Sequence, residues 1–246
     1  MKLIADLHTH TSFSTHAYST PEEMIRRAGE LGLYAIALTD HGYTMPGSPG
    51  AWYFGNMIEI PHHLHGVTVL RGAEANVCDY NGTLDIPEDE LKKLDWVVAS
   101  VHDVCMTKEP PTVEACTRMW LSVAQNPYVR VIGHSGSPTY RYDYETVIPE
   151  FGRQGKLVEI NAHSFAVRAD FIPNCRQIAL TCKKYGVPVV VDSDAHFSAH
   201  IAECDQALDM LRAIDFPEEL ILNAQEERLK AYLRQYTCVL EDESTL

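Results

Sequence analysis

The sequence predicts an α/β fold in which seven parallel strands form a distorted, TIM-like (β/α)7 barrel. Short apolar segments alternate with segments of helical character along the whole chain. The apolar segments are nearly continuous, as is typical of parallel strands that are covered on both faces. Polar residues follow almost every apolar segment, at the strand end where barrel active sites are built. An open, doubly wound sheet is the alternative arrangement.

The first β/α unit shows how each element is recognised. Residues 2–5 are an apolar run, which predicts a strand that ends at Asp6-Leu7-His8-Thr9-His10. Thr20, Pro21 and two glutamates mark the start of a helix, and Gly32 marks its end.

The later elements follow by the same criteria. We expect strands at residues 34–39, 67–74, 96–102, 129–134, 157–161 and 187–196. We expect helices at 56–60, 87–94, 112–125, from near 143, and at 173–185, 203–213 and 225–236. An Asn-Gly pair predicts a turn at 79–83, and the acidic tail at 241–243 is expected to fray. No stretch has the character of a linker, so residues 1–246 are expected to form a single domain.

The composition disfavours nucleic acid as a partner. The chain has 246 residues, of which 46% are hydrophobic, enough for a sizeable core. Its formal net charge is −14, from 34 acidic and 20 basic residues, whereas binding to a phosphate backbone requires clustered Lys and Arg. A small phosphorylated molecule remains compatible with this charge if metal ions supply the positive charge.

The cysteines and the start of the chain predict a cytoplasmic protein. The seven cysteines are odd in number and scattered, without a Cys-x-x-Cys pair, which fits reduced thiols. Asp6 and His8 interrupt the first apolar run, so no signal peptide is expected. No apolar stretch approaches the length of a membrane span.

Histidines and carboxylates gather at the expected strand ends. Alternate side chains of a strand share a face, so His8 and His10 point the same way. A histidine that only packs in a core can fall anywhere along a strand, whereas these residues converge on one barrel mouth and predict a metal site. The other strand ends carry Asp40, His41, Glu74, His102, His134, Asn161, Asp194 and His196, and His16 lies in the first loop.

The types of ligand restrict the metal. Nitrogen and oxygen donors without a thiolate suit Zn, Mn, Fe or Co rather than Ca. Seven histidines and two carboxylates exceed what one tetrahedral ion needs, and with one bridging carboxylate they would serve three ions. The nine candidate ligands are His8, His10, His16, His41, Glu74, His102, His134, Asp194 and His196.

Five motifs resemble those of the PHP (polymerase and histidinol phosphatase) superfamily. The resemblance extends from residue 3 to about residue 235, and it looks greatest to the YcdX-type metal-dependent phosphatases. The motifs are Asp6-Leu7-His8-Thr9-His10-Thr11, Thr39-Asp40-His41, Gly72-Ala73-Glu74, Gly133-His134 and Ser193-Asp194-Ala195-His196.

The resemblance implies a phosphoesterase site with three metal ions, usually zinc. His8, His10, Glu74 and Asp194 would hold the first ion. Glu74, as a bridge, would hold the second with His102 and His134, and His16, His41 and His196 would hold the third. Asp40 would act beside the ligands, either orienting one of them or taking a proton from water. Ser135 and His163 depart from the family pattern, and both bear on the substrate pocket.

Two features outside the ligand set, an arginine and a second histidine-rich segment, can each be interpreted in more than one way. Arg168, in the loop after the sixth strand, is the candidate to grip a phosphate, and a solvated arginine is the alternative. The segment His62-His63-Leu64-His65 contains another His-x-His but no carboxylate, so we interpret it as a loop feature.

The function that follows is a metal-dependent phosphoesterase, most directly a phosphomonoesterase that hydrolyses a small phosphorylated molecule with metal-activated water. An amidohydrolase-like metallohydrolase is a second hypothesis, but such enzymes often use a carbamylated lysine, and Lys108 and Lys156 lie outside the strand ends. A non-catalytic metal- or phosphate-binding module is the third hypothesis.

Overall fold

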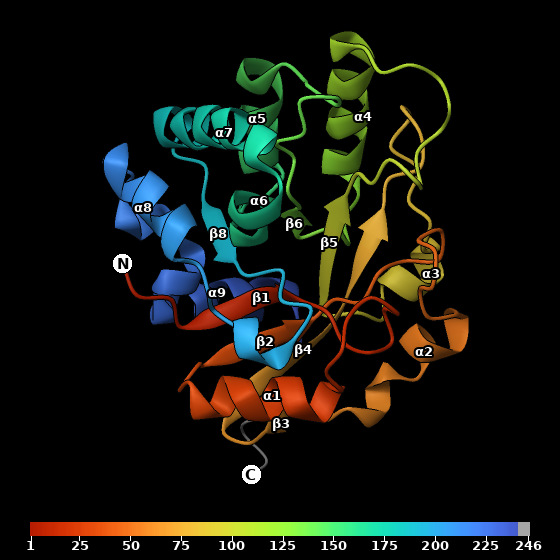
Figure 1. The fold of residues 1–246 in the computed structure, drawn as a ribbon, viewed down its shortest axis with the longest axis vertical. Coiled ribbons are helices and arrows are strands. Elements are labelled where there is room, and N and C mark those ends of the chain that lie inside the picture. Colours follow the sequence, from red (N-terminus) through yellow and green to blue (C-terminus); the bar gives the residue numbers. More distant parts are fainter. Residues whose placement is uncertain (241–246) are drawn as a thin grey trace.

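The computed structural model describes residues 1–240, and its central feature is a sheet of seven parallel strands (Figure 1). The strand order β1-β2-β4-β5-β6-β7-β8 follows the chain, as in a barrel, and confirms the predicted TIM-like fold over a doubly wound sheet. A short strand, β3 (His63–Leu64), pairs antiparallel with β4. The parallel strands are β1 (Ala5–Thr9), β2 (Ala35–Leu38), β4 (Val67–Asn76), β5 (Trp96–Ser100), β6 (Val131–Ile132), β7 (Leu157–Asn161) and β8 (Val189–Asp192).

Helices lie on the outside of this sheet and connect its strands. The first, α1 (Pro21–Glu30), begins with the predicted cap, where Thr20 Oγ1 accepts from Glu23 N and Thr20 N donates to the Glu23 carboxylate. None of the helices in residues 1–240 is long and apolar enough to cross a membrane. The other helices are α2 (Ala51–Gly55), α3 (Glu88–Leu91), α4 (Val113–Gln125), α5 (Tyr144–Arg153), α6 (Ala162–Val167), α7 (Ile172–Tyr185), α8 (Asp205–Ala213) and α9 (Glu226–Tyr236), with the 3-10 turns η1 (Met57–Glu59), η2 (Ala169–Phe171), η3 (Ser198–His200), η4 (Glu218–Leu220) and η5 (Leu222–Ala224).

Between β1 and β8, side chains replace much of the backbone ladder. The backbone contributes one bridge, between Thr9 and Ala195. The amide of Asn223 then joins the two strands, because its Nδ2 donates to Ala5 O at 3.0 Å and to Val191 O at 2.7 Å. Side chains therefore form most of the seam that joins these two strands. Two further bonds cross it, from Leu7 N to Asp192 Oδ1 (2.8 Å) and from Ser193 N to Asp6 Oδ1 (3.0 Å).

Apolar side chains fill the barrel interior at the amino ends of the strands. Leu70 and Trp96 are fully buried there, and Leu229 and Leu233 of α9 close this end. We call this group the floor cluster. Its members are Ala5, Leu7, Ala35, Ala37, Leu70, Trp96, Val98, Val131, Leu157, Val190, Leu222, Leu229, Leu233 and Val239.

Several element boundaries differ from those predicted. Residues 162–167 form a helix where a loop was expected, because the Asn161 side chain caps it by accepting from Ser164 N at 2.9 Å. The strands β6 and β8 are shorter than expected. The helix expected at 56–60 is η1, and α2 lies just before it in the long loop. The predicted frayed tail at 241–243 lies outside the described residues.

Candidate metal centre

On several strands, the polar side chains of the mouth continue the same inward face as the floor cluster. On β5, Trp96 and Val98 belong to the floor cluster, and His102 follows on the same alternating face. On β7, Leu157 belongs to the floor cluster and Glu159, two residues later, lies among the ligands. The same strands therefore build an apolar floor and a polar mouth.

Glu74, on β4, lies at the centre of the predicted ligands and is only 1% exposed. Both of its carboxylate oxygens approach imidazole nitrogens. Oε1 lies 2.8 Å from His134 Nε2, 3.4 Å from His8 Nε2 and 3.5 Å from His102 Nε2, and Oε2 lies 2.6 Å from His41 Nδ1 and 3.5 Å from His10 Nε2. A carboxylate approached from both sides has the geometry that a bridge between ions needs.

Asp194 and the remaining histidines complete the cluster. Asp194 Oδ1 lies 3.1 Å from His10 Nε2. The His16 and His41 Nε2 atoms lie 3.1 Å apart, and the His196 ring stacks on that of His10 with centroids 4.3 Å apart. The structure thus brings all nine predicted ligands to one mouth. Ligand atoms lie within 4.8 Å of one another in three sets: His8, His10 and Asp194; His41, Glu74 and His102; and His10, His41 and His196.

Unpaired buried atoms test whether metal ions fit here. His10 Nδ1 is buried and has no hydrogen-bond partner, which is rare for buried polar atoms, and the buried His41 Nδ1 and Glu74 Oε2 make no hydrogen bond although they lie 2.6 Å apart. The His8 and His10 Nε2 atoms face each other at 3.2 Å. Two nitrogens bound to one tetrahedral zinc ion lie roughly 3.3 Å apart. The donor types, their spacing and their missing partners therefore all fit divalent ions.

The electrostatics favour the protonation states that ligands need at several of these groups but not at His8, where burial lowers the pKa and the carboxylates, led by Glu159, outweigh it and raise that pKa well above its usual range. Burial raises the pKa of Glu74, but the imidazoles of His102, His8 and His41 outweigh it and hold that pKa well below its usual range. Burial lowers the pKa of His102 to about 3, and it also lowers the pKa of His10. Metal ligands must be ionised carboxylates and neutral imidazoles, which is the state of Glu74, His102 and His10 at neutral pH.

Glu159 is a functional candidate that the sequence analysis did not single out. It is 3% exposed, its Oε1 lies 2.7 Å from His8 Nδ1, and its Oε2 accepts from His134 N at 2.6 Å. A carboxylate on the second nitrogen of a ligand histidine fixes the ring and its tautomer. The bond to His134 supports a residue whose φ of 21° is unusual outside glycine. The sequence could have pointed to Glu159, because it is a charged residue inside an apolar strand, two positions before Asn161.

Asn76 orients a second ligand and was also missed. Its Oδ1 lies 2.7 Å from His102 Nδ1. Asp85 holds Asn76 in turn, because it accepts from Asn76 Nδ2 at 2.6 Å and from Asn76 N at 2.8 Å. This pairing leaves the other nitrogen of His102 facing Glu74.

Asp40 lies behind the ligands and is fully buried. Its Oδ1 accepts from Thr11 N at 2.8 Å and from Ser14 Oγ at 2.7 Å. Its Oδ2 accepts from Thr11 Oγ1 at 2.7 Å and from Tyr53 OH at 2.5 Å. Three of these hydrogen bonds anchor it to the loop that carries His16, and the fourth joins it to Tyr53 of α2, which favours orientation of a ligand over acceptance of a proton from water.

Arg168 reaches the mouth from the end of α6. Its Nη2 lies 3.9 Å from Asp194 Oδ2, and its Nη1 donates to Ser164 Oγ at 3.3 Å. Arg168 and His163 line a cavity of ≈ 390 Å³ together with six of the predicted ligands. Both residues therefore lie at the mouth beside the predicted ligands.

The two remaining sequence features lie elsewhere. The Ser135 hydroxyl lies 3.0 Å from Tyr142 OH. His62 Nε2 lies 3.1 Å from Asp95 Oδ2, and His65 Nε2 lies 2.5 Å from Glu22 Oε1. Within residues 1–240, the clusters that could hold a metal do not include this segment.

Comparisons with known proteins place the chain among phosphatases. The family model described as PHP domain matches residues 6–163. A probable phosphatase of Acetivibrio thermocellus is 43% identical over 235 residues, which cover 96% of this chain and 97% of that protein. A probable phosphatase of Clostridium novyi (strain NT) is 44% identical over 235 residues, which cover 95% of this chain and 96% of that protein.

A solved structure supports the fold. A histidinol phosphate phosphatase from Lactococcus lactis subsp. lactis, complexed with zinc, L-histidinol and phosphate, has a TM-score of 0.59 and is 16% identical. The match covers 87% of this chain and 94% of that chain. At this identity the likeness concerns the fold alone.

Proposed function

The chain belongs to the PHP family, and from this membership and the ligand cluster we propose that it is a metal-dependent phosphatase that hydrolyses a small phosphomonoester. The observation that carries the proposal is Glu74, a buried carboxylate with five imidazoles within 3.5 Å. Its two relatives described above are named probable phosphatases.

The proposed centre holds three divalent ions, with zinc as the first candidate and manganese or iron as alternatives. Glu74 would be shared between two of the ions, which its contacts on both oxygens support. The proposed ligand sets are His8, His10, Glu74 and Asp194; Glu74, His102 and His134; and His16, His41 and His196.

When bound, the ions lower the pKa of a coordinated water and neutralise charge on the phosphoryl oxygens. The protein contributes orientation. Glu159 holds the His8 ring, Asn76 holds the His102 ring, and Asp40 anchors the loop of His16. Arg168 is proposed to bind a phosphoryl oxygen, because a guanidinium beside the cluster offers charged donors to an anion.

The surroundings of the site bear on the substrate and the compartment. The net charge of −14 supports a small phosphorylated substrate over nucleic acid. All seven cysteines lie in the described part of the chain and are free thiols, which supports the proposed cytoplasmic location. We also propose that residues 1–246 form one domain.

The two rival functions are less well supported. Lys156 Nζ donates to Asn126 O at 2.5 Å and to Val129 O at 2.9 Å, before the start of β7 and far from any role as a carbamylated ligand. Lys108 is exposed. A binding module that had lost catalysis would be expected to lose ligands, whereas all nine lie together.

The test combines metal content with hydrolysis. Purified protein is expected to contain about three equivalents of divalent metal and to hydrolyse 4-nitrophenyl phosphate, with activity lost to a chelator and restored by zinc or manganese. One equivalent with activity would remove the trinuclear centre but keep the phosphatase. Three equivalents without hydrolysis of any phosphate ester would favour the binding module.

A further inference from the structure

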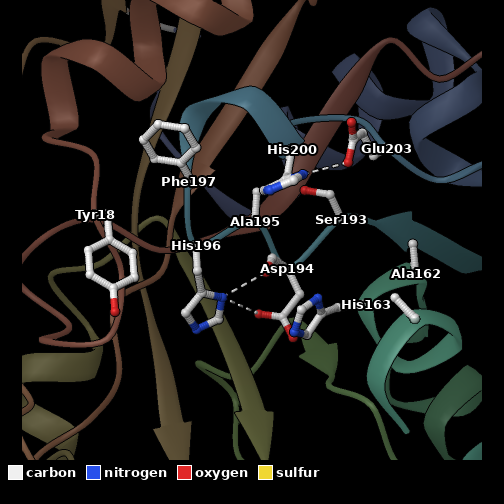
Figure 2. A pocket seen from close by; sticks show the side chains of 11 residues that line it. Tyr18, Ala162, His163, Ser193, Asp194, Ala195, His196, Phe197, His200 and Glu203 are labelled. Carbon is white, nitrogen blue, oxygen red and sulfur yellow. Dashed lines mark hydrogen bonds and ion pairs between the residues drawn. The ribbon is translucent and has the colours of Figure 1, made fainter. Parts of the chain in front are cut away.

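A second cavity opens beside the ligand cluster. It has a volume of ≈ 410 Å³ and shares His163, Asp194 and His196 with the cavity that contains the ligands. In Figure 2, His196 and Asp194 lie between the Tyr18 side of this cavity and the α6 side that carries Ala162 and His163. A molecule whose phosphate lies at the cluster can therefore extend into this space directly.

Small apolar side chains give the cavity its room. Ala162 and Ala166 are four residues apart on α6 and so face the same side of the helix, and Ala195 lies between two mouth residues of the seventh β/α unit. Larger side chains at these positions would fill the space. The surface of the cavity is therefore more apolar than polar, which suits an apolar group.

Two exposed aromatic rings form the rim. Tyr18 is 76% exposed and Phe197 is 45% exposed, and both rings stand on the same side of His196 (Figure 2). Hydrogen bonds hold the two segments that carry these rings together, since Tyr18 N donates to His196 O at 2.9 Å and Ser198 N donates to Ser19 Oγ at 3.0 Å. Aromatic rings at a cavity rim offer flat apolar faces on which a flat group can stack.

The charges around this cavity differ from those around the phosphate. Arg168 borders the ligand cavity, but none of the residues that line the second cavity is a lysine or an arginine. The outer edge carries the Glu203 carboxylate, whose Oε2 lies 2.6 Å from His200 Nδ1. A second negative charge on the substrate would find no lysine or arginine there and would lie near the Glu203 carboxylate.

We propose that the second cavity binds the alcohol part of the substrate, and that this alcohol carries an aromatic ring and no negative charge. The proposal rests on the proposed phosphomonoesterase function. In the reaction, water adds to phosphorus, the bond from phosphorus to the ester oxygen breaks, and the free alcohol and inorganic phosphate leave. Tyr18 and Phe197 act as specificity residues that contact the ring.

The experiment compares two esters whose alcohols have similar acidity, benzyl phosphate and ethyl phosphate, on the metal-loaded enzyme. The ratio of their kcat/KM values is expected to favour benzyl phosphate by at least about tenfold, as expected for a ring placed in a fitting apolar pocket. Phe197→Ala and Ala166→Phe should each lower this ratio by about tenfold. A carboxylate on the benzyl ring should raise KM.

Matched variants provide the controls. Val167 is exposed, adjoins Ala166 and does not line the cavity, so Val167→Phe should leave the ratio unchanged. Thr139→Phe fills a different, more polar cavity of ≈ 310 Å³ beside His102, and it should also leave the ratio unchanged. If Thr139→Phe lowers the preference for benzyl phosphate over ethyl phosphate and Ala166→Phe does not, the assignment of the aromatic ring to the second cavity is wrong.

The outcomes separate this proposal from the function on which it rests. If both esters are hydrolysed with equal kcat/KM, the aromatic pocket is wrong and the phosphatase stands. If neither ester nor 4-nitrophenyl phosphate is hydrolysed by the metal-loaded protein, the phosphatase itself is wrong.

Discussion

The two ends of the barrel interior are built from the same strands, yet their buried side chains have opposite requirements. At the amino end, Leu70, Leu229 and Leu233 are fully buried against other apolar groups and need no further partner. At the carboxyl end, buried atoms of His10, His41 and Glu74 make no hydrogen bond within the described residues, although His41 Nδ1 and Glu74 Oε2 lie 2.6 Å apart. Buried polar atoms without partners destabilise the folded state, whereas buried apolar surface stabilises it.

The difference shows how stability and function are divided along each strand. The mouth also contains non-glycine residues at positive φ, His134 at 21° and Asp194 at 53°, which are conformations that cost energy unless the surroundings impose them. The floor cluster and the helices around the sheet supply the stability that supports this arrangement. We therefore expect changes at the mouth to alter metal binding and activity, and changes at the floor to alter the free energy of unfolding.

The largest effect on activity is expected from Glu74→Gln. Replacing a residue that only supports a ligand typically costs 10- to 100-fold, so loss of the shared carboxylate should lower kcat/KM by at least about 10²-fold and reduce metal content per chain. Metal analysis and 4-nitrophenyl phosphate hydrolysis measure both. Glu145→Gln, on the exposed face of α5, is the control. Full metal content and activity in Glu74→Gln would refute the central role of this residue.

A substitution in the floor cluster should lower stability and leave metal binding and activity nearly unchanged. Leu233→Ala removes buried methyl groups from the helix that closes the barrel, and it should lower the free energy of unfolding by about 2–5 kcal/mol. Metal content and kcat/KM of the folded protein should stay within about twofold, because distant sites are nearly additive. Arg228→Ala, on the exposed side of α9, is the control and should change neither the free energy of unfolding nor the metal content and kcat/KM. Loss of metal in folded Leu233→Ala would show that the two ends are coupled.

A smaller effect on the mouth is expected from Glu159→Gln. The amide keeps an acceptor for His134 N but loses the charge beside His8 Nδ1, so metal affinity should fall by roughly 10- to 100-fold while some activity returns at high metal concentration. Competition with a chelator of known affinity measures the change. Activity that stays absent at saturating metal would place Glu159 in the chemistry itself rather than in positioning.

The smallest effect concerns Lys156, near the amino end of β7, where burial lowers the pKa to about 8. The pKa of the unfolded lysine is about 10.4, so between these values the unfolded chain binds more protons and the free energy of unfolding should rise with pH. Lys156→Met has no such proton. The stability of the wild type relative to this variant, from urea unfolding, should therefore increase between about pH 8 and pH 10. A constant difference would contradict the lowered pKa.

The sequence by itself determined the strand and helix alternation and the candidate ligands. Apolar runs and helix caps such as Thr20 with Glu23 are local, so they can be read without the fold. His102, Glu74 and Asp194 each stand at or near the end of such a run, and parallel strands bring their ends together. Both inferences depend on periodicity and chain order alone.

Only the tertiary structure decided what surrounds the ligands. Glu159 meets His8 across 151 residues, and Asn223 joins β1 to β8 across the seam. The four hydrogen bonds to Asp40, and the open space beside His196, likewise arise from segments that meet only in the folded chain. Such contacts leave no local pattern, because their distances are set by how the barrel closes and not by spacing along the sequence.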